Sequence, residues 1–182
     1  MRLLIVGPQG AGKGTQAALL AKSLRIPHVS TGDLFRANLA SGTELGKLAK
    51  KYMDAGELVP DEVTQEMVAD RVRQPDAEAG FLLDGFPRNI PQAQWLNSLL
   101  AGMKAPVHAV VLLTAPDHVL LNRMLARGRN DDTVEAITRR LDIYHRETTP
   151  LIDFYDGRVV HVDGVGDVDE VHERVLAAVR GR

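Results

Sequence analysis

The sequence contains no cysteine and no long apolar run, and these two absences limit what the protein is able to be. Without cysteine, the chain forms neither disulfides nor a zinc site made of thiolates, which fits a reducing compartment. Its apolar runs, such as Leu3–Val6 and the longer one around Ala109–Leu113, are far too short to span a bilayer. We therefore expect a soluble cytoplasmic protein without a membrane partner.

An excess of one charge is also missing. The 182 residues include 22 lysines and arginines and 24 aspartates and glutamates, and the basic residues are spread along the chain. A net charge of −2 without basic runs does not favour polymeric nucleic acid as a partner. With 45% hydrophobic residues, the chain is long enough for one well-buried core, so we expect a single domain.

A glycine-rich loop, Gly7–Thr15, lies between two regular segments. Leu3–Val6 before it predicts a short strand, and Gln16–Lys22 after it has strong helix propensity. The loop sequence GPQGAGKGT contains the GxxxxGK pattern. Glycines let several backbone N–H groups approach one phosphate, Lys13 adds a point charge, and the helix adds its positive dipole end. The loop therefore predicts binding of a nucleotide's phosphates, with an ordinary glycine-rich turn as the alternative.

The loop departs from the general phosphate-binding pattern directly after its lysine. That pattern has Ser or Thr there as a ligand for Mg²⁺, whereas this chain has Gly14 and only then Thr15. We therefore expect Mg²⁺ to be held mainly by substrate phosphates and water, with no direct protein ligand.

Short apolar runs alternate with segments of helical pattern along the whole chain. The runs predicted as strands are Leu3–Val6, His28–Val29, Gly80–Leu83, Val107–Leu113 and Arg158–Val162. This alternation predicts a doubly wound α/β fold with a five-stranded parallel sheet that helices cover on both faces. Ligands of such sheets bind at the carboxyl ends of the strands, where the glycine loop and Asp84 would both lie. For Asp84 the alternative is an ordinary turn or capping aspartate.

Two stretches interrupt the alternation. Between Ser30 and Pro60 the pattern is helical without a strand, which predicts a small helical flap beside the core. Arg127–Asp132 is a short charged loop between two predicted helices, and its residue types alone favour a solvated turn. Arg123 and Arg127 are four residues apart on one predicted helix, where like charges repel unless a polyanion binds them.

Four motifs in fixed order resemble the adenylate kinase family. They are Gly7–Gln16, Ser30–Arg36, Asp84–Arg88 with Gln92 and Ala93, and a stretch from Arg123 through Arg139-Arg140 and Tyr144 to Thr149–Leu151. The likeness covers nearly the whole chain. It implies a monomer with a core of the P-loop NTPase type that transfers a phosphoryl group reversibly from Mg·ATP to AMP, giving two ADP.

The same resemblance implies one kinase core over residues 1–182 with two inserted segments. It implies an AMP-binding flap at residues 30–59 and a short ATP lid at residues 126–132. Many bacterial members of the family have a longer lid that often binds zinc. The short form agrees with the lack of cysteine and implies no structural zinc.

The resemblance also assigns residues to the site, and the chemistry explains the many arginines, because phosphoryl transfer requires charge neutralisation at the reacting group. The implied catalytic residues are Lys13, Asp84, Arg88, Arg123, Arg129 and Arg140. The residues implied for ATP are Gly10, Ala11, Gly12, Lys13, Gly14, Thr15, Arg123, Arg127 and Gly166. The residues implied for AMP are Thr31, Arg36, Glu57, Leu58, Val59, Gly85, Phe86, Pro87, Arg88, Gln92, Arg129 and Arg140. Asp84 would orient waters on Mg²⁺.

Base specificity depends on Gln92, whose amide offers both a donor and an acceptor to adenine. The related pyrimidine monophosphate kinases typically differ from this chain at Thr31 and Gln92, which favours AMP over UMP or CMP. Asn89 keeps the pyrimidine alternative open, because those kinases often have Asn directly after the arginine of this motif.

Two other classes of protein compete with a kinase. A nucleotide sensor that keeps the fold without turnover would have lost the transition-state arginines, which this sequence retains. A P-loop GTPase would need Ser or Thr directly after Lys13 and an Asn-Lys-x-Asp motif, and both are absent. Gln9 stands where the family usually has proline, and we expect this difference to have only a small effect on activity.

Overall fold

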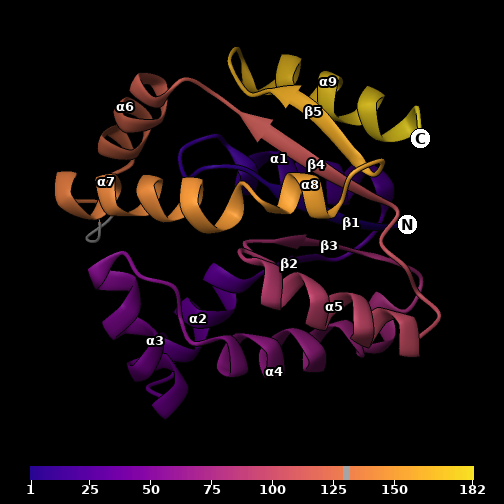
Figure 1. Ribbon diagram of the computed structural model, residues 1–182, viewed down its shortest axis with the longest axis horizontal. Coiled ribbons are helices and arrows are strands. Elements are labelled where there is room, and N and C mark those ends of the chain that lie inside the picture. Colours follow the sequence, from indigo (N-terminus) through magenta and orange to yellow (C-terminus); the bar gives the residue numbers. More distant parts are fainter. Residues whose placement is uncertain (129–131) are drawn as a thin grey trace.

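The computed structural model describes residues 1–128 and 132–182, and in this part of the chain five parallel strands form one sheet. The strand order is β2-β3-β1-β4-β5: from β1 the chain first forms the edge strand β2, returns to place β3 between β2 and β1, and then adds β4 and β5 on the other side of β1 (Figure 1). The strands are β1 (Arg2–Val6), β2 (His28–Ser30), β3 (Phe81–Asp84), β4 (Ala109–Thr114) and β5 (Val159–Asp163). The prediction of a doubly wound, five-stranded parallel sheet is confirmed.

Helices cover both faces of the sheet. The helices are α1 (Lys13–Leu24), α2 (Thr31–Ala40), α3 (Glu44–Ala55), α4 (Asp61–Val72), α5 (Ile90–Gly102), α6 (Asp117–Arg127), α7 (Val134–Ile143), α8 (Leu151–Phe154) and α9 (Val168–Arg180). Single turns of 3₁₀ and π geometry occupy Pro75–Ala77 and Tyr144–Thr148. No helix in residues 1–128 or 132–182 is long and apolar enough to cross a bilayer.

The two faces of the sheet have separate cores because side chains alternate along each strand. Leu3 and Ile5 pack with α1, α6 and α9 on one face, where Leu20 and Val175 are fully buried. Leu4, like Val6, packs with α4, α5 and α8 on the other face. Strands buried on both faces explain why the sequence shows continuous apolar runs.

The segment between β2 and α4 is helical, as its pattern predicts. It contains α2 and α3, and a third, smaller apolar cluster around Phe35, Ala49 and Val59 lies outside the two cores that flank the sheet. In Figure 1, α3 and α7 face each other at one end of the molecule, far from both termini. Most of the flap's own packing is therefore local, which separates it from the sheet.

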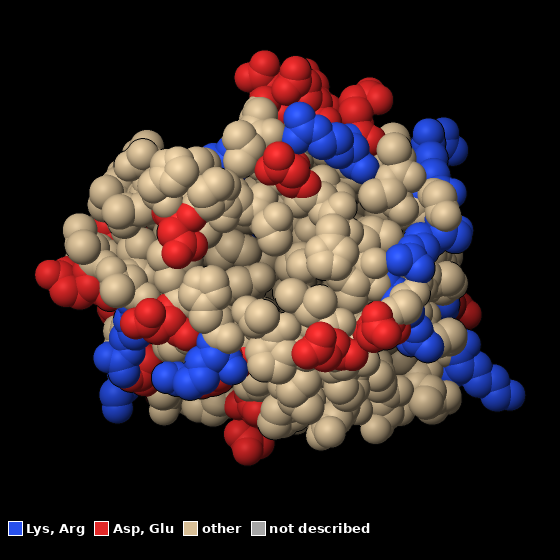
Figure 2. Space-filling view, turned by 45° about the horizontal axis from the view of Figure 1, so that its top comes forward, with Lys and Arg blue, Asp and Glu red and all other residues tan. Residues whose placement is uncertain are grey.

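Charged side chains of both signs lie on the surface. Figure 2 shows a face on which acidic and basic side chains are interspersed around a largely uncharged centre. Elsewhere in the molecule charged side chains pair locally, as Arg71 does with Asp76 at 2.8 Å.

Candidate active site

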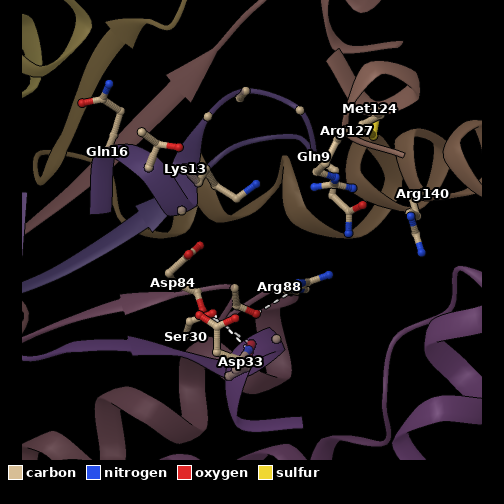
Figure 3. A pocket seen from close by; sticks show the side chains of 18 of the residues that line it. Gln9, Lys13, Gln16, Ser30, Asp33, Asp84, Arg88, Met124, Arg127 and Arg140 are labelled. Carbon is tan, nitrogen blue, oxygen red and sulfur yellow. Dashed lines mark hydrogen bonds between the residues drawn. The ribbon is translucent and has the colours of Figure 1, made fainter. Parts of the chain in front are cut away.

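A pocket of about 910 Å³ lies at the carboxyl ends of the strands. Its walls come from the β1–α1 loop, the start of α2, the end of β3, the α3–α4 connection, and helices α6 and α7. Figure 3 shows Lys13 and Asp84 on the sheet side, with Arg127 and Arg140 coming from the helices across the pocket. The fold thus collects charged side chains from both halves of the chain around one space.

The β1–α1 loop needs its glycines. Gly7, Gly10 and Gly12 have φ angles of 150°, 86° and 95°, which other residues rarely adopt. A Cβ on Gly7 would also lie 2.1 Å from the carbonyl oxygen of Leu113, so a larger residue would displace the backbone. Among the described residues no side chain caps α1, and the first residues of this helix line the pocket. The positive end of α1 is therefore open to an anion.

Lys13 is the cation of this loop. Its ammonium group donates a hydrogen bond of 2.9 Å to the carbonyl oxygen of Pro8. Burial lowers the pKa of Lys13 to about 8; Asp84 opposes this shift, and Arg88 and Arg127 add to it. A bound polyphosphate would restore the charge, because an anion beside the ammonium favours its protonated form.

Asp84 lies at the end of β3, as predicted, and only 8% of the residue is exposed. Its Oδ2 atom is 3.3 Å from Nε2 of His28, which limits the rotation of the carboxylate. The start of α1 lies close by, since an added Cβ on Gly14 would lie 3.7 Å from the same Oδ2 atom. An oxygen ligand of this kind, next to an anion site, suits a hard divalent cation and its water shell.

Arginines approach the pocket from four segments, and the lining includes Arg36, Arg88, Arg123, Arg127 and Arg140. Burial lowers the pKa of Arg88; Asp84 opposes this effect, and Arg140 and Arg36 add to it. An arginine nevertheless stays protonated in proteins, so the pocket holds several like charges close together. This concentration of positive charge is unfavourable for the empty pocket and favourable for a bound polyanion.

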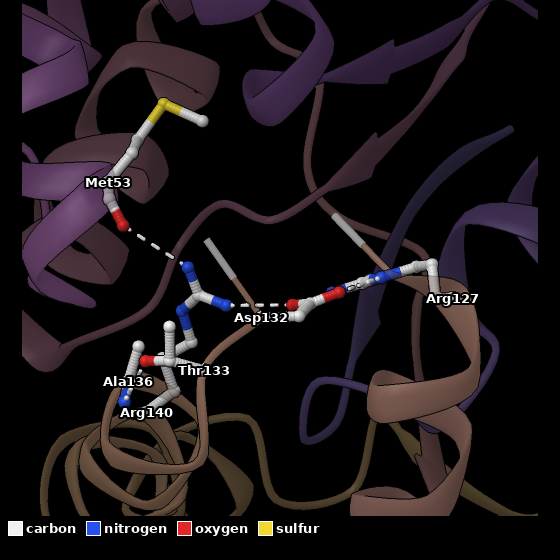
Figure 4. A network of polar contacts seen from close by, with 6 residues as sticks. All are labelled: Met53, Arg127, Asp132, Thr133, Ala136 and Arg140. Carbon is white, nitrogen blue, oxygen red and sulfur yellow. Dashed lines mark hydrogen bonds and ion pairs between the residues drawn. The ribbon is translucent and has the colours of Figure 1, made fainter. Parts of the chain in front are cut away.

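Some of this repulsion is offset by Asp132, whose side chain is fully buried. Arg127 donates to both of its carboxylate oxygens, at 2.9 and 2.7 Å, and Arg140 donates to Oδ1 at 3.1 Å. Arg140 also donates to the carbonyl oxygen of Met53 at 3.1 Å (Figure 4). This network links α6 and α7 to the end of α3 across the pocket.

Arg123 is held differently, by backbone carbonyl groups. It donates to the carbonyl oxygen of Gly10 at 3.4 Å and to that of Gly164 at 3.0 Å. These two contacts keep the guanidinium beside the glycine loop, and they use only part of its donors.

Nearly all of the predicted site residues line this one pocket. Phe86 does not, because it is 1% exposed and packs edge to face against Trp95 with 5.9 Å between ring centroids. Pro87 borders a smaller cavity of about 40 Å³ beside the pocket. Arg129 lies outside the described residues. The roles assigned to these residues stay predictions, but the proximity of the lining residues is a property of the fold.

Residues that the sequence reasoning missed also contribute to the site. Met53 accepts the hydrogen bond from Arg140, His28 contacts Asp84, and Asp61 accepts one from Gln92 at 2.7 Å. No sequence signal identifies Asp61, because acidic residues are common in the first turn of any helix. The Met53 contact uses a backbone atom and is therefore equally invisible in the residue type.

Within residues 1–128 and 132–182, no three His, Asp or Glu side chains come together as a group that could hold a metal ion.

Comparison with known proteins agrees with the geometry. The family model described as adenylate kinase matches residues 5–160. The adenylate kinase of Nocardia farcinica is 56% identical over 179 residues, which cover 98% of this chain and 99% of the relative. That of Rhodococcus erythropolis is 52% identical over the same shares of both chains. The adenylate kinase of Stenotrophomonas maltophilia is 50% identical over 99% of this chain and 100% of its own.

The match of the family model, the near full-length relatives and the parallel sheet with its phosphate loop all support one assignment. The chain belongs to the adenylate kinase family of phosphotransferases.

Proposed function

We propose that phosphoryl transfer between ATP and AMP takes place in the 910 Å³ pocket, with ATP beside the β1–α1 loop and AMP beside α2 and α3. The observation that carries this assignment is the convergence of Lys13 with arginines from α2, α6, α7 and the loop after β3. Such an excess of fixed positive charge suits two nucleotides whose phosphates meet in the middle of the pocket.

For the transfer itself, the protein must position the two nucleotides and stabilise the charge on the reacting group. The bond between the terminal phosphorus of ATP and the β–γ bridging oxygen breaks, and a bond to a phosphate oxygen of AMP forms, so both products are ADP. Negative charge spreads over the transferred group and the leaving oxygen, where guanidinium groups stabilise it. We assign Arg123 and Arg127 to ATP, and Arg36 and Arg88 to the AMP phosphate.

Arg140 lies between the Asp132 side of the pocket and the end of α3. It contacts Asp132 on one side and the Met53 carbonyl oxygen on the other. A guanidinium at this junction grips two phosphate oxygens in a fixed fork, which lysine does not reproduce. We assign Arg140 to the transferred group itself, together with Lys13.

The pocket fits Mg²⁺ that is bound mainly through nucleotide phosphates. Asp84 offers the carboxylate oxygen that this ion and its waters prefer, and it lies beside Lys13 at the open end of α1 (Figure 3). When bound, the ion supplies positive charge to the β- and γ-phosphates. His28 holds the Asp84 side chain in orientation, and Lys13 binds the same phosphates from the loop side.

The proposal includes assignments at a larger scale. Residues 30–59 act as the AMP-binding flap and residues 126–132 as the ATP lid, in a cytoplasmic monomer. The separate apolar cluster of α2 and α3 supports the flap assignment. Residues 129–131 of the lid, including Arg129, lie outside the part of the chain that the structure describes.

The pyrimidine alternative loses its main support at Asn89. The Asn89 side chain accepts the backbone N–H of Gln92 at 2.9 Å and thereby caps α5. Its amide nitrogen points to Asp61, and Asn89 does not line the pocket. Asn89 therefore has a structural role in the described residues that does not involve a base.

The direct test is detection of ADP formed from Mg·ATP with AMP, UMP, CMP or GMP, with a control without acceptor and a Lys13→Ala sample. We expect ADP formation with AMP alone and its loss in the variant. Preference for UMP or CMP would instead identify a pyrimidine kinase. Tight nucleotide binding without turnover would identify a sensor. ADP that forms slowly in the control without acceptor would measure the unwanted hydrolysis of ATP.

A further inference from the structure

Three polar side chains form a small cluster behind the AMP side of the pocket. Oε1 of Gln92 accepts the backbone N–H of Arg88 at 2.7 Å, and its Nε2 donates to Oδ1 of Asp61 at 2.7 Å. Asn89 donates to the same Asp61 oxygen at 3.3 Å. Gln92 lines the pocket, whereas Asp61 and Asn89 do not, so Gln92 alone connects the cluster to a ligand.

The partners of Gln92 fix which way its amide points. A backbone N–H only donates, so the atom facing Arg88 must be the amide oxygen. A carboxylate only accepts, so the atom facing Asp61 must be the amide nitrogen. A reversed amide would set two donors against each other on one side and two acceptors on the other. Gln92 is 2% exposed, so water could not relieve either conflict.

A Gln92 amide with this fixed direction has a defined remaining capacity. An amide has two N–H donors and two acceptor sites, so one of each is left after the contacts with Asp61 and Arg88. The base-pairing edge of adenine offers an acceptor at N1 and a donor at its 6-amino group. A 6-oxopurine offers the opposite, a donor at N1 and an acceptor at O6. For a base held in one orientation by its ribose and phosphate, only the 6-aminopurine matches an amide that is prevented from turning over.

We propose that Asp61 is a positioning residue that sets the direction of the Gln92 amide and thereby the preference for a 6-aminopurine over a 6-oxopurine monophosphate. This inference rests on the proposed function, in which Gln92 faces the acceptor base. Asp61 suits this role because it is the first residue of α4, where the helical backbone fixes the point from which its side chain extends. One of its two carboxylate oxygens, Oδ1, accepts hydrogen bonds from both Gln92 and Asn89.

The test compares AMP with IMP, which differ only at the 6-position and N1, as acceptors for Mg·ATP. In Asp61→Ala we expect the KM for AMP to rise about tenfold with kcat nearly unchanged, because the amide loses a charge-assisted partner. The ratio of kcat/KM for AMP to that for IMP should fall by a similar factor. Asp61→Asn, which can still present an acceptor oxygen, should recover most of the selectivity.

Glu62→Ala is the matched control. Glu62 is the next residue in the first turn of α4 and is exposed, so its loss removes the same charge from the same helix end without touching Gln92. If Glu62→Ala lowered the AMP to IMP ratio as much as Asp61→Ala, a general electrostatic effect would explain both, and the proposal would be overturned.

A Gln92→Ala background separates the inference from the function on which it rests. If Gln92→Ala leaves the AMP to IMP ratio unchanged, then the assignment of Gln92 as base reader fails. If Gln92→Ala lowers the ratio but Asp61→Ala does not, then only the role of Asp61 fails. The proposal expects Asp61→Ala to have no further effect on the ratio when Gln92 is already alanine, since its influence passes through that side chain.

Discussion

Lys13 keeps its charge in a place that burial makes unfavourable for a cation. With a folded-state pKa of about 8 against an ordinary 10.5, the protonated lysine destabilises the empty protein below pH 8. The proposed function explains why the chain tolerates this cost, because the phosphates of a nucleotide bound there would supply the missing opposite charge. Residues arranged for a charged ligand commonly reduce the stability of the free protein.

We predict that Lys13→Met abolishes turnover and raises the free energy of unfolding at pH 7 by up to about 3 kcal/mol. Between pH 8 and 10.5 the unfolded chain binds more protons than the folded one, so wild-type stability rises there. The advantage of the variant should therefore shrink as the pH approaches 10.5. Urea unfolding at pH 7 and pH 10 measures both effects.

Lys22→Met provides the comparison for this measurement. Lys22 is exposed on the same helix, so the same substitution there should change stability by no more than about 0.5 kcal/mol at either pH. An advantage of Lys13→Met that did not depend on pH would point to better packing of methionine, and the electrostatic explanation would be wrong.

At the scale of elements, the flap depends on a close crossing of α2 and α3. A Cβ on Gly46 would lie 2.3 Å from the backbone nitrogen of Leu39 and 2.4 Å from the carbonyl carbon of Asn38. Both are backbone atoms, so no side-chain rotation relieves the clash. Glycine is needed here for the close approach of two helices and not for an unusual φ angle.

We predict that Gly46→Ala destabilises the flap by about 2 kcal/mol and raises the KM for AMP more than the KM for ATP. The physical reason is that α3 must move away from α2, which displaces the side of the pocket assigned to AMP. Guanidinium unfolding and steady-state kinetics with each nucleotide varied in turn provide the measurements.

Gly102→Ala serves as the control substitution. Gly102 ends α5 with open space around its Cβ position, so alanine there should be neutral or stabilising by less than about 1 kcal/mol. The prediction is wrong if the two substitutions have equal effects, or if Gly46→Ala raises only the KM for ATP. Either result would show that the crossing of α2 and α3 does not control AMP binding.

At the scale of the whole molecule, the reaction requires the pocket to open for two nucleotides and close against water. The flap has only its small cluster around Phe35, Ala49 and Val59, whereas the sheet is packed on both faces. Segments with little apolar burial open at low free energy cost, so the flap is the part of the described chain best suited to move.

We predict that a two-headed analogue joining ATP and AMP slows hydrogen exchange near Gly42, Gly56 and Gly128. These glycines lie at the ends of α2, α3 and α6, where a change of backbone angles moves a helix. Amides of β1 should exchange equally slowly with and without the analogue. Unchanged exchange at all three glycines, measured with the site saturated, would contradict closure.

Most of the fold was predictable from sequence because its signals are local. Apolar runs such as Leu3–Val6 and the helical pattern after Ser30 identify elements, and short strands between helices leave few possible topologies. Boundaries were less certain. The fourth strand begins at Ala109 instead of Val107, because a strand ends where its hydrogen-bonded neighbours end and not where the apolar residues do.

The sequence by itself determined the phosphate loop, the alternation of strands and helices and the supply of arginines, because glycine spacing, apolar patterning and residue charge are properties of the chain alone. Only the tertiary structure decided how those charges are held. Arg140 contacts Met53 across 87 residues, and Gln92 contacts Asp61 across 31. Such contacts form only when two elements meet at a particular angle, which the residue types do not specify. The direction of each hydrogen bond then decides which donors and acceptors a side chain presents to a ligand.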